Sequence, residues 1–263
     1  MKLSMMSYTL ARQVKKGAQF DIVAMCRLAQ ELKITAVDMV TLYGRPAAEV
    51  RKILSDHGLA IACHTFMGSE LNKSTVGERT AGVDAVKRGI DDAVTLGCRT
   101  VMVVTPGDKA CPRDISRRNY IRGLQESSVL ARAAGITKTI ENFPGPATPF
   151  AISSDVLEAI REEPGLKLTF DNGNVLTGGE NPAVSFKRCA EHVAHAHFKD
   201  WTITPEGSGM ECMSGQWIKA ALIGEGIVDQ AACLKAMRDC GYKGYVNIEY
   251  EGDAYPADQA VRQ

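Results

Sequence analysis

Hydrophobic and polar positions alternate in two different rhythms along this chain. Short β-branched or apolar runs, typical of buried strands, recur between longer segments whose apolar residues stand three or four positions apart, the spacing of a helix that buries one face. Eight such runs occur. The predicted strands are Leu3–Tyr8, Ala36–Val40, Ala60–His64, Thr100–Thr105, Thr137–Asn142, Lys167–Asp171, Val193–Phe198 and Tyr245–Tyr250.

Amphipathic segments separate these strands. Several run into a glycine directly before the next strand, as at Gly97 and Gly135, where a left-handed helix end favours glycine. Asn181, followed by Pro182, and Asp229 are residue types that cap helix starts. The predicted helices are Asp21–Leu32, Ala47–Asp56, Val83–Leu96, Tyr120–Ala133, Ser154–Glu162, Pro182–Glu191 and Gln230–Asp239.

This regular alternation predicts an α/β fold, a closed (β/α)8 TIM barrel formed by residues 1–263 as a single domain. A doubly wound open sheet seldom needs such regular spacing. Only residues 254–263 follow the last strand, so we expect the closing C-terminal helix to be truncated. The one long connection, 201–225, is rich in Gly, Pro and Ser and is expected to be an active-site lid, with disorder as the alternative.

Composition narrows the function classes. The 31 basic residues balance 31 acidic ones, so no basic surface for nucleic acid is expected. No apolar run is long enough for a membrane span, and the first residues do not resemble a signal peptide. Eight scattered cysteines without a C-x-x-C pair indicate free thiols and a cytoplasmic protein. The pattern leaves the oligomeric state open, and a homo-oligomer is compatible with it.

Candidate chemistry lies at the ends of the last four predicted strands. Because alternate side chains of a strand share a face, the apolar residues of each strand place the remaining ones inside the barrel. On this phase Glu141, Asp171, His197 and Glu249 point inward at the C-terminal tips, where barrel enzymes carry their active sites.

Three carboxylates in one barrel mouth would repel one another and be driven toward protonation unless a cation lies among them. Oxygen ligands with one imidazole suit Mn²⁺, Mg²⁺ or Co²⁺ better than a thiolate zinc site. We therefore expect one divalent metal ion, Mn²⁺ before Mg²⁺, Co²⁺ or Zn²⁺. Below the tips, a polar layer of Thr139, Thr169, His195 and Asn247 is expected to support the ligands by hydrogen bonds.

Five short motifs occur in order and at barrel spacing: Ile140-Glu141-Asn142, Phe170 to Asn174, His195 to Asp200, Gly224 to Asp229, and Ile248 to Glu251. At these residues the chain resembles, over essentially its whole length, the xylose isomerase-like TIM barrel superfamily. That superfamily includes sugar-phosphate isomerases, ketose 3-epimerases, hydroxypyruvate isomerases, inosose dehydratases and family-IV AP endonucleases.

The resemblance implies a single metal bound by Glu141, Asp171, His197 and Glu249, with Glu141 and Glu249 also acting as catalytic acid and base. One departure concerns the substrate. Ketose epimerases of the superfamily carry a histidine that touches the substrate three residues after the strand-six aspartate, and Asn174 stands there in this chain.

Further contacts to a small carbohydrate substrate are expected around this mouth. His64 and Lys199 are placed at the tips of the third and seventh strands, where they would reach substrate oxygens. Asn142 and Trp201 are expected to form pocket walls, with the Trp201 ring stacking on a sugar face. Asn174 completes this set of predicted substrate-binding residues.

The ligand set predicts an isomerase or epimerase that acts on a keto-sugar, a sugar phosphate or a related polyol. A metal chelated by a carbonyl and a neighbouring hydroxyl would stabilise the cis-enediolate that forms when the adjacent C–H loses its proton. One glutamate would remove the proton and the other return it. The alternative is a dehydratase or lyase of inosose or dehydroshikimate type, in which the same intermediate expels a β-hydroxyl.

Three other classes are weighed against this one. A catalytically inactive sugar-binding barrel would keep the fold and lose the metal. An AP endonuclease is disfavoured because its trinuclear zinc site is rich in histidine, whereas this chain has five histidines and no basic face. An amidohydrolase-type barrel is disfavoured because its H-x-H pair opens the first strand, whereas His195 and His197 lie in the seventh.

Overall fold

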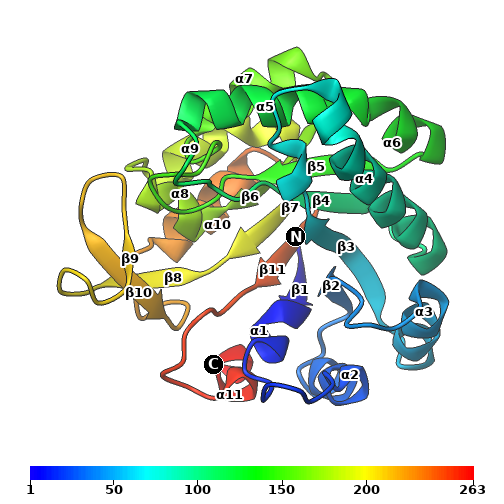
Figure 1. Cartoon of the computed structure of the whole chain (residues 1–263). Coiled ribbons are helices and arrows are strands. Elements are labelled where there is room, and N and C mark those ends of the chain that lie inside the picture. The colour runs from blue at the N-terminus through cyan, green and yellow to red at the C-terminus, as the bar shows by residue number, and fades with distance from the viewer.

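The computed structural model describes all residues 1–263, and its centre is a closed barrel of eight parallel strands (Figure 1). The strands follow one another around the barrel in the order β1, β2, β3, β4, β5, β6, β7 and β11, and β11 pairs with β1 to close it. The predicted (β/α)8 barrel is therefore confirmed. The strands are β1 (Lys2–Met6), β2 (Ala36–Val40), β3 (Ala60–Met67), β4 (Thr100–Val104), β5 (Thr137–Glu141), β6 (Lys167–Asp171), β7 (Val193–Phe198) and β11 (Tyr245–Ile248).

Helices surround the barrel, as Figure 1 shows. Their starts follow the expected chemistry, because Asn181 and Asp229 accept hydrogen bonds from the backbone N–H of the third residue along. The α-helices are α1 (Ser7–Ala11), α2 (Ile22–Glu31), α3 (Ala47–Asp56), α4 (Val76–Leu96), α5 (Arg113–Glu126), α6 (Ser128–Ala134), α7 (Ser153–Glu162), α8 (Asn172–Thr177), α9 (Pro182–Cys189), α10 (Gln230–Asp239) and α11 (Ala257–Arg262), with short 3-10 turns η1 (Ser69–Leu71) and η2 (Ala190–His192).

Two helix predictions need correction. α4 begins seven residues before the predicted Val83, because Thr75 and Glu78 form a capping box at its start. The predicted helix Tyr120–Ala133 is two helices, α5 and α6, which meet at Ser127. The Ser127 hydroxyl donates to the carbonyl of Leu124, a local bond that competes with the regular helical pattern.

The long connection after β7 is also different from the prediction. It forms a three-stranded antiparallel sheet of β8 (Asp200–Ile203), β10 (Trp217–Ala221) and β9 (Met210–Glu211), which projects from the side of the barrel (Figure 1). The alternative of a disordered loop is therefore wrong, and the role of an active-site lid stays a prediction. Backbone pairing between β8 and β10, from Asp200 opposite Ala221 to Ile203 opposite Ile218, orders the segment.

One buried carboxylate closes this side sheet at its base. Asp200 accepts hydrogen bonds from the backbone N–H groups of Trp201, Gly224, Gly226 and Val228, at 2.9 to 3.1 Å. A side chain at Gly226 would lie 2.2 Å from the Asp200 carboxylate, so glycine is required there. The motif from Gly224 to Asp229 thus anchors the returning chain beside β7.

A core of 45 buried hydrophobic residues lies between the strands and the surrounding helices. Inside the barrel, by contrast, the middle layer is polar: Thr139 and Thr169 share a 2.7 Å hydrogen bond, and the Ser4 hydroxyl donates to Asn247. The structure contains no helix that is both long and apolar enough to cross a membrane.

Candidate active site

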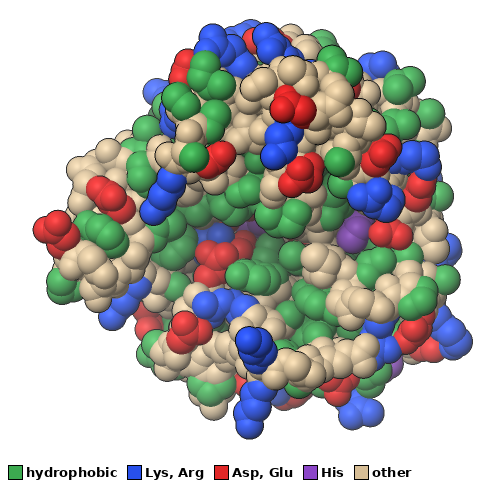
Figure 2. All heavy atoms as spheres, viewed as in Figure 1, with side chains coloured by type: hydrophobic (Ala, Val, Ile, Leu, Met, Phe, Trp, Pro, Cys, Tyr) green, Lys and Arg blue, Asp and Glu red, His purple; other side chains and the backbone are tan.

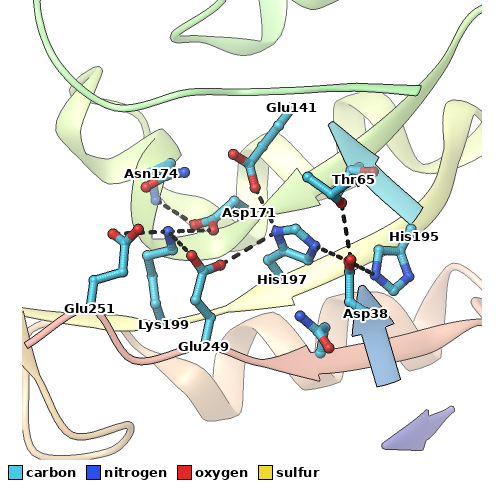
Figure 3. A network of polar contacts seen from close by, with 12 residues as sticks. Asp38, Thr65, Glu141, Asp171, Asn174, His195, His197, Lys199, Glu249 and Glu251 are labelled. Carbon is cyan, nitrogen blue, oxygen red and sulfur yellow. Dashed lines mark hydrogen bonds and ion pairs between the residues drawn. The ribbon is translucent and has the colours of Figure 1, made fainter. Parts of the chain in front are cut away.

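The four predicted ligands converge at the mouth of the barrel, at the C-terminal ends of β5, β6, β7 and β11. Glu141, Asp171, His197 and Glu249 are all buried, and one ligand atom of each lies within 4.8 Å of the others (Figure 3). The strand register explains this. Asp171 lies opposite His197 on neighbouring parallel strands, and Glu141 and Glu249 close the adjoining strands.

The His197 imidazole lies at the centre of this group. Its Nδ1 atom is 2.6 Å from Glu141 Oε1 and 3.4 Å from Glu249 Oε2. Its Nε2 atom is 2.9 Å from Asp38 Oδ2 on the opposite side of the ring. Burial alone would lower the pKa of His197, but the carboxylates of Asp38 and Glu141 raise it well above its usual value.

Asp38, from β2, is a functional candidate that the sequence prediction missed. It is fully buried, and it also contacts His195 Nε2 at 3.1 Å and the hydroxyl of Thr65 at 3.0 Å. Burial opposes ionisation of Asp38, yet hydrogen bonds from His195 and His197 leave its pKa below the usual range. With Nε2–H donated to Asp38, the Nδ1 atom of His197 faces Glu141 and Glu249, and in the protonated ring it donates to Glu141 (Figure 3).

Asp171 joins the site to the helix that follows. Its Oδ1 atom accepts from the backbone N–H of Asn174 and so caps α8. Its Oδ2 atom is buried without a hydrogen-bond partner, and the same holds for Glu249 Oε2. Lys199 Nζ lies 3.2 Å from Asp171 Oδ2 as an ion pair. Burial raises the pKa of Asp171 to about 8, against the lowering effect of Lys199.

Lys199 is the cation of the mouth. Besides Asp171, its ammonium group lies 3.0 Å from Glu249 and 3.4 Å from Glu251. Burial would lower the pKa of Lys199, but Asp171 and Glu249 raise it well above the usual value. Glu251, two residues beyond Glu249 and in the same inward phase, was not predicted as a site residue.

A cavity of about 220 Å³ opens onto this group, and Glu141, His197, Lys199, Glu249 and Glu251 line one side of it. Figure 2 shows a hollow in this face of the molecule where acidic side chains (red) lie next to hydrophobic ones (green). The donor set fits a divalent cation. It combines carboxylate oxygens and one imidazole, one oxygen of Asp171 and one of Glu249 lack hydrogen-bond partners, and burial raises the pKa of Asp171.

Only some of the predicted substrate-binding residues line the cavity. Lys199 lines the cavity, as expected. The prediction that His64 reaches the mouth is wrong, because β3 continues three residues further to Met67 and turns Thr65 and Met67 inward. His64 bonds to the carbonyl of Met39 and packs beside Phe66 on the opposite face of the strand.

Asn142 and Trp201 do not line the cavity either. The Asn142 side chain donates to the carbonyl of Asp171 and accepts from its N–H, at 2.7 and 2.9 Å, so it holds the backbone of a predicted ligand. Trp201 packs under the side sheet with Ile218 and Val228, and its ring lies 5.8 Å from Lys199 Nζ. Both side chains therefore support the site from outside the cavity, and the prediction that they form pocket walls is wrong.

Asn174 does not line the cavity either, and its contact with the substrate stays a prediction. Its side chain is completely buried beside Asp171 (Figure 3), and neither its amide nitrogen nor its amide oxygen has a hydrogen-bond partner. His195, one layer deeper, bonds to Asp38 and packs edge-on against His197 at 5.1 Å between ring centroids. That position agrees with the predicted supporting layer.

Sequence comparison finds similar proteins among the inosose dehydratases. An inosose dehydratase of Lacticaseibacillus casei is 25% identical over 150 residues, which cover 53% of this chain and 50% of that protein. This chain spans about half the length of the first curated relatives that it matches.

Two solved structures share the fold. The IOLI protein, solved with a zinc atom, has a TM-score of 0.81 at 16% identity, covering 100% of this chain and 94% of that chain. A D-tagatose 3-epimerase-like protein has a TM-score of 0.76 at 18% identity, covering 100% and 95%. At these identities the likeness shows the fold alone.

The family match is broader. The family model described as "Xylose isomerase-like TIM barrel" matches residues 16–263, nearly the whole chain, and so includes all four predicted ligands. The resemblance inferred from the five motifs is thereby confirmed. This chain belongs to the xylose isomerase-like TIM barrel family.

Proposed function

We propose that this protein is a divalent-metal-dependent enzyme that moves a proton next to the carbonyl group of a keto-sugar or related polyol. The observation that carries the proposal is the convergence of Glu141, Asp171, His197 and Glu249 within 4.8 Å at the wall of a cavity. The relatives named as sugar-modifying enzymes support it. All eight cysteines are free, which supports a cytoplasmic location.

These four residues would hold one ion, for which Mn²⁺ is our first candidate. A bound divalent ion would polarise the substrate carbonyl and stabilise negative charge on its oxygen. The zinc atom of the IOLI structure supports metal binding by a protein of this fold. Asp38 would keep His197 in the tautomer that offers Nδ1, and Asn142 would fix the backbone that carries Asp171.

Glu141 and Glu249 would carry the proton. They come from β5 and from the end of β11, and both line the cavity, so a substrate bound there would meet two carboxylates from different strands. One carboxylate removes the C–H proton, and the other returns a proton to the same or the adjacent carbon. The outcome is epimerisation or 1,2-isomerisation. Lys199 would hold a substrate oxygen beside Glu249.

A dehydratase is the second candidate, favoured by the inosose dehydratases among the relatives. Its chemistry needs an acid for the departing hydroxyl as well as a base for the C–H proton. Lys199 supplies an ammonium group inside the cavity, 3.0 Å from Glu249, and would donate a hydrogen bond to the departing hydroxyl next to the proposed base. A barrel that only binds sugars would need none of these groups.

The test is solvent-deuterium exchange with protein reconstituted with Mn²⁺. Ketoses and inososes are incubated in D₂O, and the loss of one C–H signal is followed by proton NMR. Exchange without net water loss supports an epimerase or isomerase, whereas loss of water supports the dehydratase. Protein that retains no stoichiometric metal and exchanges no C–H proton overturns the proposal and leaves a binding barrel.

A further inference from the structure

The cavity at the barrel mouth has two unlike sides. Its charged side comes from β5, β7, β11 and the residues just after them. Seven of its 14 lining residues are hydrophobic, and most of these come from β2, β3, β4 and the segment after β5. The apolar wall, as we name this side, consists of Val40, Met67, Met102, Val104, Phe143 and Pro144.

The apolar wall is packed in place. Met102 and Val104 occupy successive inward positions of β4, form a buried cluster with Cys63, and have Phe143 packed against them. Met67 lies opposite Val104 in the β3–β4 register, so the wall continues from strand to strand. A surface held by strand geometry keeps its shape when a substrate enters.

Apart from the Tyr8 hydroxyl, which also lines the cavity, few free polar groups lie near this wall. The Thr65 hydroxyl lines the cavity but donates to Asp38 at 3.0 Å. Lys199 is the one lysine or arginine in the lining, and it is shared among Asp171, Glu249 and Glu251. A substrate hydroxyl placed against the wall would lose water and gain no partner, which is unfavourable.

We propose that the substrate is unphosphorylated and turns an apolar flank, a methyl, methylene or deoxy carbon, toward the apolar wall. A phosphate dianion requires several cationic or N–H donors, and this cavity offers one lysine that three carboxylates already engage. A fully hydroxylated sugar could satisfy its groups only along the charged side. This inference rests on the proposed function and narrows its substrate to deoxy-ketoses or deoxy-inososes.

The test uses ketoses that differ only at carbon 6. Mn²⁺-loaded protein is given 6-deoxy-D-fructose, D-fructose and D-fructose 6-phosphate, and L-fuculose is compared with L-tagatose. Exchange of C–H protons gives relative kcat/KM, and calorimetry gives binding. We expect each deoxy sugar to be preferred about tenfold over its hydroxylated partner, and no binding of the phosphate.

Hydroxylated sugars that bind and exchange as well as their deoxy partners overturn the inference, as does binding of the phosphate. Exchange of none of the sugars, with the deoxy preference kept in binding, overturns the proposed function and leaves the inference standing. Binding without any deoxy preference overturns the inference whatever the exchange shows. The inference is also overturned if the protein binds none of the deoxy sugars.

A matched pair of variants locates the selectivity. Val104→Thr adds one hydroxyl to the apolar wall at nearly constant volume and should reduce the deoxy preference about fivefold. Val103→Thr makes the same change one residue earlier, on the side chain that packs into the main core, and should leave the preference unchanged. Equal effects of the two variants, or none in Val104→Thr, would contradict the assignment of the wall.

Discussion

The two halves of the barrel mouth differ in the side chains that they turn to the cavity. At the tips of β5, β7 and β11, Glu141, His197 and Glu249 line the cavity, with Asp171 of β6 buried beside them. The tips of the first four strands present hydrophobic residues, most of them in the apolar wall. Only Asp38, one layer below the tip of β2, crosses this division, and it does so to reach His195 and His197.

This difference separates two tasks within one fold. The charged half is linked by hydrogen bonds and ion pairs, so a change at one residue affects its neighbours. The apolar half is held by packing and can change without disturbing those bonds. It also excludes water, which strengthens every electrostatic interaction on the other side of the cavity.

The largest expected effect comes from the two glutamates. Glu141→Gln and Glu249→Gln each keep the shape of the side chain but remove the proton acceptor, so exchange of the substrate C–H proton should fall by about 10²- to 10⁴-fold. The measurement is deuterium incorporation by NMR. Glu211→Gln, on the exposed edge strand β9, is the control and should exchange at the normal rate. Normal exchange in Glu141→Gln would remove it from the proposed pair.

Metal loading should stabilise the fold through the charged half. At a Mn²⁺ concentration of 100 times Kd, the free energy of unfolding should rise by about 2.7 kcal/mol. For a chain of this length that corresponds to a rise in Tm of roughly 5–10 °C. Asp171→Asn should abolish the rise. If Mn²⁺ leaves the Tm of the unmodified protein unchanged, the four side chains hold no ion.

Asp38 gives the next effect in size. Asp38→Asn removes the anionic partner of His197 Nε2 and should weaken Mn²⁺ binding about 10- to 100-fold, measured by calorimetry. Asp84→Asn, an exposed aspartate on α4, serves as the matched control. An unchanged Mn²⁺ affinity in Asp38→Asn would show that packing alone orients the imidazole.

A cation placed on the apolar half should change what that half accepts. Met67 is 54% exposed at the rim of the cavity, so Met67→Lys can be accommodated there. One new ion pair should make the binding of D-fructose 6-phosphate measurable by calorimetry, whereas the unmodified protein is expected not to bind it. Met213→Lys, an exposed methionine on the side sheet, should leave that binding as it was. No gain in Met67→Lys would show that the wall does not face the substrate terminus.

The polar layer under the charged half should give the smallest effect. Thr139→Val deletes hydrogen bonds to Thr169 and to the carbonyl of Val101, and it should lower the free energy of unfolding by about 1 kcal/mol. The corresponding fall in Tm, by calorimetry, is about 2–4 °C. Thr139→Ser keeps the hydroxyl and should lose less. Equal losses in both variants would assign the effect to the methyl group.

The sequence predicts the barrel and the charged half well because both depend on local alternation. β2, β6 and β7 have their predicted bounds, and the inward phase of β6 and β7 places Asp171 and His197 as expected. Asp38 could have been found from the sequence, because an aspartate inside the apolar strand Ala36–Val40 indicates a buried charge that needs partners.

The remaining errors concern features that alternation does not encode. His64 was assigned to the wrong face because the end of β3 depends on its pairing with β4 as far as Met67. The side sheet was missed because its antiparallel pairing joins short strands across turns of Gly, Pro and Ser. The apolar wall was not predicted because apolar side chains that point into a barrel usually fill its core. Only the cavity beside them shows that they also form a surface.

The Asp200 carboxylate has a consequence for how this molecule can vary. It ties both ends of the segment 202–223 to the same point beside Lys199, and one further backbone bond, from Met213 to Thr177, joins the middle of the segment to α8. Doubling the length of such a closed loop costs only about 0.6 kcal/mol in chain entropy. Residues between Ile203 and Trp217 are therefore a natural place for insertions in evolution, and for grafting a new binding element in the laboratory.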